Sequence, residues 1–184
     1  MARSDPTLLD FALLGLLCGQ SMSGYDIRKL FETTPIGRFS SSQGSIYPAL
    51  QRLERGTLVK GTVQRATTLR PRKLYRLTAA GRAALVAWMK RPIEPRDVER
   101  RLDELCLRFA FMEHLLPRAD RVAFTEQLCR ALRTHVQYLE QHYRNVRGSM
   151  ALHARLSLEL GVEAYKVQLR WAERAAEAIR AESQ

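Results

Sequence analysis

Cysteine, long apolar runs and residue repeats are scarce in this 184-residue chain, and each shortage excludes a class of protein. The three cysteines (Cys18, Cys106 and Cys129) are an odd number at wide spacing, which excludes a disulfide framework and a cysteine-based zinc site. No apolar stretch reaches the roughly 18 residues of a membrane span, and the first residues lack the pattern of a signal peptide. We therefore expect a cytoplasmic protein with no membrane partner.

The patterns that enzymes need are also missing. The sequence has no glycine-rich phosphate loop and no serine nucleophile elbow. His135 and His142 are seven residues apart, but no further ligand converges on them. The adjacent acids Asp103 and Glu104 belong to a charged helix and do not face each other as catalytic carboxylates do. The sequence thus predicts no enzyme activity, no metal and no cofactor.

Acidic residues are few in the first half of the chain. Residues 1–95 contain 15 lysines and arginines against 6 aspartates and glutamates, whereas residues 96–184 contain 15 against 13. Nearly all of the formal net charge of +11 therefore belongs to the first half. A basic half joined to a near-neutral half favours a nucleic-acid surface on one lobe, although a solvated basic face has the same composition.

The order of elements in the first half indicates a fold. Apolar residues recur at helical spacing in four stretches, and two stretches between the third and fourth have the pattern of strands joined by a cationic tip. The order helix, helix, turn, helix, β-hairpin predicts a winged helix-turn-helix domain over residues 1–92. The expected helices are 7–18, 24–32, 43–55 and 79–89, and the expected strands are 57–63 and 73–77.

The third helix and the hairpin supply candidate DNA-binding residues. In a helix-turn-helix, the second helix of the pair lies in the major groove of DNA. Serines before and at its start can donate to phosphates, glutamines can pair with base edges, and an arginine can read guanine. Basic residues of the hairpin would reach phosphates or the minor groove. These candidates are Ser41, Ser42, Gln43, Ser45, Gln51, Arg52, Arg70 and Arg72.

The second half, residues 96–184, has helical spacing throughout, over 96–116, from Pro117 to Val146, and over 152–181. The last of these helices has two apolar rows, one of which contains Leu156, Leu160 and Val167. A helix that is apolar on more than one side must be covered on more than one side. We therefore predict that this all-helical domain forms a homodimer. The predicted fold class is mainly α with a small β-hairpin.

Blocks of the first half resemble the PadR family of phenolic-acid decarboxylase repressor-like regulators. The resemblance rests on LLGLL at 13–17, SGYDI at 23–27, GSIYPALQRLE at 44–54 and RPRKLYRLTAAG at 70–81. It implies a homodimeric winged-helix repressor that binds double-stranded operator DNA and responds to a small aromatic or drug-like effector. It also implies that Tyr47 contacts the DNA backbone through its hydroxyl, and that Lys73 and Arg72 anchor the wing.

The sequence departs from the family in two places. The residues Gln20–Ser23 replace a proline and histidine that usually precede the glycine-tyrosine pair. Thr57 stands where the family usually has glycine before the first wing strand, while Gly56 comes one residue early. The second departure affects the direction in which the wing points.

Three aromatic residues are candidates for the effector site. Trp88, Phe109 and Trp171 could line a cleft, although each also fits a helical packing stripe. Two other functions stay open: a different winged-helix regulator, such as a MarR-like one, and a protein-interaction adaptor that binds no DNA. The tyrosine-proline-alanine-leucine block argues against the first, and the basic face of residues 43–55 argues against the second.

Overall fold

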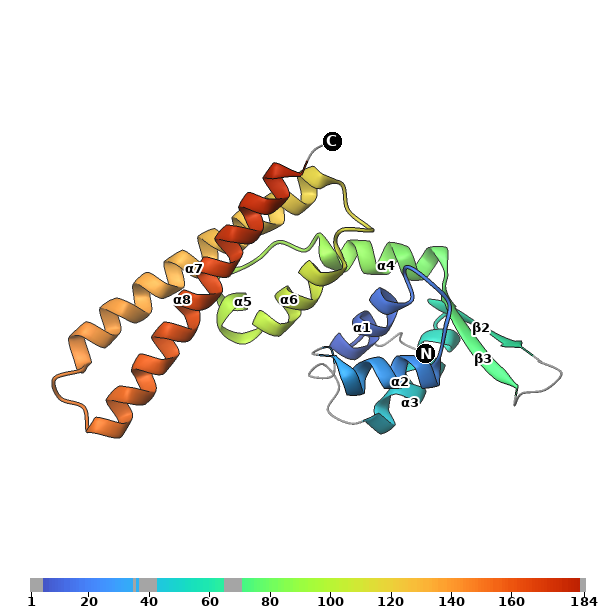
Figure 1. The fold of residues 1–184 in the computed structure, drawn as a ribbon, viewed down its shortest axis with the longest axis horizontal. Coiled ribbons are helices and arrows are strands. Elements are labelled where there is room, and N and C mark those ends of the chain that lie inside the picture. The colour runs from blue at the N-terminus through green and yellow to red at the C-terminus, as the bar shows by residue number, and fades with distance from the viewer. Residues whose placement is uncertain (1–4, 35, 37–42, 65–70, 183–184) are drawn as a thin grey trace. The chain divides into compact units, whose positions relative to one another are not determined.

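The computed structural model describes residues 5–34, 36, 43–64 and 71–182, and the chain divides into two compact units, residues 1–89 and 90–184. Within the described residues, the first unit contains four α-helices, the 3-10 turn η2 and three short strands. Figure 1 labels its helices and the strands β2 and β3. Their bounds are α1 Leu8–Leu16, β1 Met22–Ser23, α2 Gly24–Thr33, η2 Gln43–Ser45, α3 Ile46–Arg55, β2 Val59–Gln64, β3 Arg72–Leu77 and α4 Ala79–Met89.

Two capping boxes set the starts of α1 and α2. The Thr7 hydroxyl accepts from the Asp10 backbone N–H at 3.3 Å, and the Asp10 carboxylate accepts from the Thr7 N–H at 2.8 Å. Ser23 and Asp26 repeat this arrangement at 3.2 and 3.1 Å. Each box satisfies backbone donors that a helix start leaves open. Ser23 is thus the N-cap of α2.

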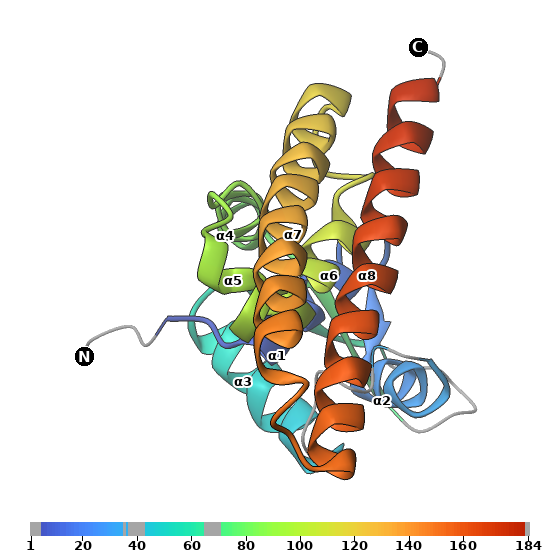
Figure 2. The same ribbon diagram turned by 90° about the vertical axis from the view of Figure 1, so that its left-hand side faces the viewer.

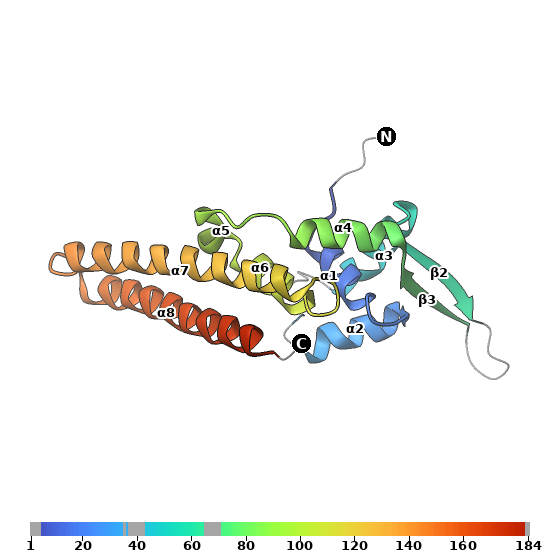
Figure 3. The ribbon, with the colours of Figure 1, turned by 90° about the horizontal axis from the view of Figure 1, so that it is seen from above.

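The sheet is three-stranded and antiparallel, in the order β1-β3-β2. Val59 pairs with Leu77 and Gln64 with Arg72 in the β2–β3 hairpin, which Figure 3 shows as two adjacent arrows. The lone hairpin that the sequence predicts is therefore corrected, because β1 adds two residues on the other side of β3. The mainly helical class with a small sheet is confirmed.

The core of the first unit forms around α1, which packs against both α3 and α4. Ile46, Ala49, Leu50 and Leu53 make the buried stripe of α3 at the predicted spacing. The ring of Phe11 stacks on Trp88 with centroids 4.3 Å apart. The apolar side of α1 therefore fixes where α3 lies.

The second unit is helical in every element that the structure describes. Its helices are α5 Pro95–Arg100, α6 Leu102–Phe111, α7 Arg118–Val146 and α8 Leu152–Ala181. The single helix predicted over 96–116 is wrong, because the backbone leaves helical geometry at Arg101 (φ −135°, ψ 26°). Val98 of α5 and Leu105 of α6 are both buried.

The long helices α7 and α8 lie side by side (Figure 2). Leu128, Leu132 and Val136 of α7 and Val162 and Ile179 of α8 are buried. The apolar row of α8 that contains Leu156, Leu160 and Val167 stays exposed, with Leu160 at 71% and Val167 at 55%. One side of α8 is therefore covered within the chain, and the other is not.

The structure also bears on the cysteines, on membrane-spanning helices and on metal-binding groups. Cys18, Cys106 and Cys129 form no disulfide, and Cys129 is buried. Among the described helices, none is both long and apolar enough to cross a bilayer. Within the same residues, no group of three or more histidines, cysteines and acids lies close enough to hold a metal ion.

Candidate nucleic-acid interface

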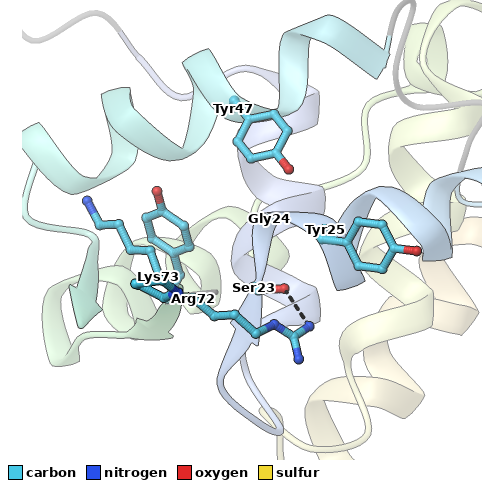
Figure 4. A pocket seen from close by; sticks show the side chains of 8 residues that line it. Ser23, Gly24, Tyr25, Tyr47, Arg72 and Lys73 are labelled. Atoms are coloured by element: carbon cyan, nitrogen blue, oxygen red, sulfur yellow. Dashed lines mark hydrogen bonds between the residues drawn. The ribbon is translucent and has the colours of Figure 1, made fainter. Parts of the chain in front are cut away.

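The first unit has an open hollow of about 630 Å³ between the start of α2, α3 and the start of β3. Tyr47 extends into it from α3, while Ser23 and Tyr25 come from the start of α2 (Figure 4). Arg72 and Lys73 of β3 form the basic side. Hydroxyl groups and cations gathered at one surface are the groups that proteins use to hold nucleic-acid phosphates.

The position of Tyr47 depends on a glycine. A Cβ added at Gly24 would lie 2.5 Å from Cε1 of Tyr47, closer than real contacts allow. Only a residue without a side chain lets the ring of Tyr47 lie against the first turn of α2. The ring stays 45% exposed, so this contact fixes the tyrosine without burying it.

Arg72 is bound to the start of α2. Its guanidinium donates to Asp26 at 3.0 Å and to the Ser23 hydroxyl at 3.4 Å. A hydrogen bond from the Ser23 side chain is the main cause that lowers the pKa of Asp26. Partial burial opposes this shift, while the Ser23 backbone and Arg72 add to it. The carboxylate is thus held ionised, and it ties β3 to α2.

Lys73 is bound to the end of α3. Its Nζ donates to Glu54 at 2.6 Å, and Glu54 also accepts from the Gly61 N–H at 3.1 Å. The hydrogen bond between the two side chains is the main cause that lowers the pKa of Glu54 and raises that of Lys73. The Lys73 ammonium lies 5.2 Å from the ring centroid of Tyr75. Both candidate wing anchors therefore have carboxylate partners in the DNA-free chain.

Arg52 is bound to α1. Its Nη2 lies 2.6 Å from Oδ1 of Asp10, and its Nε lies 3.4 Å from Oδ2. The Asp10 side chain is only 2% exposed, so the arginine compensates a buried charge. Reading of guanine by Arg52 stays a prediction, and it would require the guanidinium to leave this carboxylate.

The other candidates on α3 divide by exposure. Tyr47, Pro48, Gln51 and Arg55 are exposed at spacings of three and four, so they share one face of the helix. Ser45 precedes α3 without a side-chain capping bond, and it is half-buried. Ser41, Ser42 and Arg70 lie outside the described residues, as does the side chain of Gln43.

Sequence reasoning missed the three acids that hold these cations: Asp10, Asp26 and Glu54. A local signal existed for two of them, since Thr7-x-x-Asp10 and Ser23-x-x-Asp26 have capping-box spacing. Their arginine partners lie 42 and 46 residues away. Glu54 has no local signal, and it pairs with a lysine 19 residues later.

The candidate effector residues fall in both units. Trp88 belongs to the first unit, where it is 2% exposed and stacked on Phe11. Phe109 and Trp171 belong to the second unit and meet edge to face, with centroids 5.0 Å apart. A role in ligand binding stays a prediction for all three.

Residues 13–87 match the model of the transcriptional regulator PadR-like family. The Negative transcriptional regulator PadR of Bacillus subtilis (strain 168) is 36% identical over 125 residues, which cover 66% of this chain and 65% of that protein. The Probable transcriptional regulator Rv1176c of Mycobacterium tuberculosis (strain ATCC 25618 / H37Rv) is 32% identical over 88 residues, covering 47% and 46%. This chain thus spans less than two thirds of the length of either relative.

Among solved structures, the chain is similar to Bacillus subtilis PadR in complex with operator DNA. The two are 27% identical, and the match covers 93% of this chain and 97% of that one, with a TM-score of 0.43.

Proposed function

We propose that this chain, which belongs to the PadR-like family of transcriptional regulators, is a repressor that binds a DNA operator as a homodimer. The observation that carries the proposal is the hollow in the first unit. Tyr47 of α3, the second helix of the helix-turn-helix pair, lines this hollow together with Arg72 and Lys73 of the wing. The similarity to a relative named a negative regulator supports repression.

In this proposal α3 enters the major groove with its exposed face. Gln51 lies on that face and has the amide geometry to pair with an adenine edge. Tyr47 donates its hydroxyl to a phosphate beside the groove. Arg55, exposed on the same face, joins these residues, whereas Arg52 acts first as a link to α1.

Arg72 and Lys73 bind phosphates from the base of the wing. Each would exchange a carboxylate for a phosphate when DNA binds, and the carboxylates hold both cations beside the hollow until then. Ser41, Ser42, Gln43 and Arg70 complete the proposed contact set. Ser45 belongs to the same set at the start of α3.

The second unit would supply the dimer contact. Leu152, Leu156, Leu160 and Val167 leave an apolar row exposed on α8, and a second copy of this chain would cover it. A two-fold dimer matches a palindromic operator, whose half-sites are about 34 Å apart for one helical turn. The single change Leu160→Glu is expected to give a monomer, which sedimentation would detect. Arg147→Glu introduces the same acidic residue at an exposed site away from the row, and it is expected to leave the dimer intact.

The remaining parts of the proposal concern regulation and location. A small aromatic or drug-like effector would act near Phe109 and Trp171, whose rings are in contact. The chain would act as a regulator and not as an enzyme. Because a repressor works where the chromosome is, we place it in the bacterial cytoplasm.

DNA binding is tested by selecting duplexes from a random library with the full chain. Fluorescence anisotropy then compares the selected duplex with a scrambled one at several salt concentrations. Arg72→Ala and Lys73→Ala are each expected to weaken binding to both duplexes. Each is also expected to reduce the slope of log affinity against log salt by about one.

The controls separate sequence reading from phosphate contact. Gln51→Ala is expected to weaken only the selected duplex, since a base contact is specific. Arg147→Ala removes one exposed positive charge from the second unit and should leave the salt slope unchanged. An unchanged slope for both wing variants would contradict the assignment of the wing.

A further inference from the structure

The carboxylate of Glu54 connects α3 to both strands of the wing. Its Oε2 accepts from Nζ of Lys73 on β3 at 2.6 Å, and its Oε1 accepts from the N–H of Gly61 on β2 at 3.1 Å. Because β2 is an edge strand of the sheet, the second bond satisfies a backbone donor at that edge. One side chain thus ties α3 to β2 and β3 at once.

Gly61 provides the space for these bonds. A Cβ added at this position would overlap Cε of Lys73 and would lie 2.5 Å from Oε1 of Glu54. Both atoms belong to flexible side chains, so a side chain at position 61 would push the two groups away while the backbone stays in place. The φ of Gly61 is not positive, so an alanine can adopt the same backbone conformation.

The carboxylate is a second attachment between α3 and β2. The first is the backbone that joins them, in which the Thr57 N–H donates to the Glu54 carbonyl and the Leu58 N–H to the Leu53 carbonyl, both at 2.9 Å. Strand β2 starts directly afterwards, and Gly61 is its third residue. Two attachments along one strand fix its direction relative to the helix, whereas one would leave the strand free to turn.

The charge of Glu54 also acts where the wing would bind phosphates. The Glu54 side chain is 30% exposed and that of Lys73 is 41% exposed, so a phosphate can reach the pair. The carboxylate competes with that phosphate for the ammonium and also repels it. Glu54 differs in one respect from Asp26, the acid that holds Arg72, because Asp26 belongs to the capping box of α2.

We propose that Glu54 is a positioning residue that determines how strongly the chain prefers its operator over other DNA. This inference rests on the proposed function and adds a residue that itself binds no DNA. On the operator, the bond to the Gly61 N–H keeps the wing in the direction that α3 requires, even after Lys73 has moved to a phosphate. On other DNA, α3 is out of register, so the carboxylate only opposes the phosphates.

Three variants separate the two effects by anisotropy with the selected and scrambled duplexes. Glu54→Ala removes both, so the ratio of the two affinities is expected to fall at least about threefold, while binding to the scrambled duplex strengthens about twofold. Glu54→Gln has no charge but keeps an oxygen that can accept from the Gly61 N–H. It is expected to strengthen binding to both duplexes and to preserve most of the ratio.

Gly61→Ala makes the opposite separation, because it keeps every charge and displaces the Glu54 carboxylate. Binding to the selected duplex is expected to weaken at least about threefold, while binding to the scrambled duplex changes little. Glu32→Ala is the control for net charge, since it removes an exposed acid of the same unit that is paired with Arg28. The ratio should be unchanged in this control.

The outcomes separate this inference from the proposed function. Circular dichroism and urea unfolding identify the folded variants, and Gly61→Ala decides alone if Glu54→Ala does not fold. An unchanged ratio in either folded variant, a fall with Glu54→Gln equal to that with Glu54→Ala, or a matching fall in the Glu32→Ala control would each overturn the role of Glu54 while the proposed function stands. An unsubstituted chain that does not prefer the selected duplex would overturn the proposed function, and this inference with it.

Discussion

Thr57 is the position where the backbone of the first unit departs most clearly from what its side chain favours. Its φ of 62° is the one positive value among the non-glycine residues that the structure describes. The Thr57 N–H donates to the Glu54 carbonyl, and the Leu58 N–H donates to that of Leu53, both at 2.9 Å. These two bonds form a Schellman motif, whose left-handed residue is usually glycine.

The substitution Thr57→Gly should therefore stabilise the first unit. A left-handed conformation costs an L-residue about 1–2 kcal/mol. Glycine removes that cost but adds about 0.4–1 kcal/mol of chain entropy in the unfolded state. The side chain of Thr57 is exposed, and the bond from the Thr78 hydroxyl goes to the Thr57 backbone carbonyl. The net gain in the free energy of unfolding is expected to be about 0.5–1 kcal/mol.

Urea unfolding measures this gain if the signal comes from the first unit. In a Trp171→Phe background, Trp88 is the one remaining tryptophan, and it is buried in that unit. Thr57→Ala keeps a Cβ at the positive φ and should gain much less than Thr57→Gly. Equal stability of the two variants, or a loss with glycine, would refute the argument that the left-handed backbone carries the cost.

Other consequences follow from the contacts around the hollow. Asp10→Ala should destabilise the first unit by about 2 kcal/mol in urea unfolding, because it removes the capping box of α1 and the carboxylate partner of Arg52. A loss below about 0.5 kcal/mol would contradict this. Gly24→Ala should displace Tyr47 and weaken DNA binding without a comparable loss of stability, seen by anisotropy and unfolding together. The pKa of Asp26 is lowered in the folded chain, so its contribution to stability is complete above the pKa of the unfolded chain and is lost as pH falls through the pKa of the folded chain. Asp26→Asn should therefore flatten the dependence of the free energy of unfolding on pH below about pH 4. An unchanged dependence would count against the hydrogen bond from Ser23.

Sequence patterns predicted the elements that local chemistry decides. The buried stripe of α3 depends on residues within one or two helical turns. Pro48 falls in the first turn of α3, where its missing N–H costs nothing.

The parts that sequence patterns missed depend on distant residues. Strand β1 has only two residues, and it forms because Met22 pairs with Tyr75 of β3, which comes much later in the sequence. The break at Arg101 is invisible in the apolar spacing, which continues through it. The partners of Arg52 and Arg72 lie more than 40 residues away, so the basic face looked unpaired in the sequence.

The carboxylate of Asp10 also limits how this protein can change during evolution. It caps α1 and binds Arg52 of α3 at once, so the loss of either partner alone leaves a buried or unmatched charge. Two apolar residues of similar volume could replace the pair together at little cost, because a buried ion pair is often matched by good packing. Substitutions at positions 10 and 52 should therefore occur jointly among relatives, while Gln51, the next residue along α3, remains free to vary with the DNA sequence that each relative recognises.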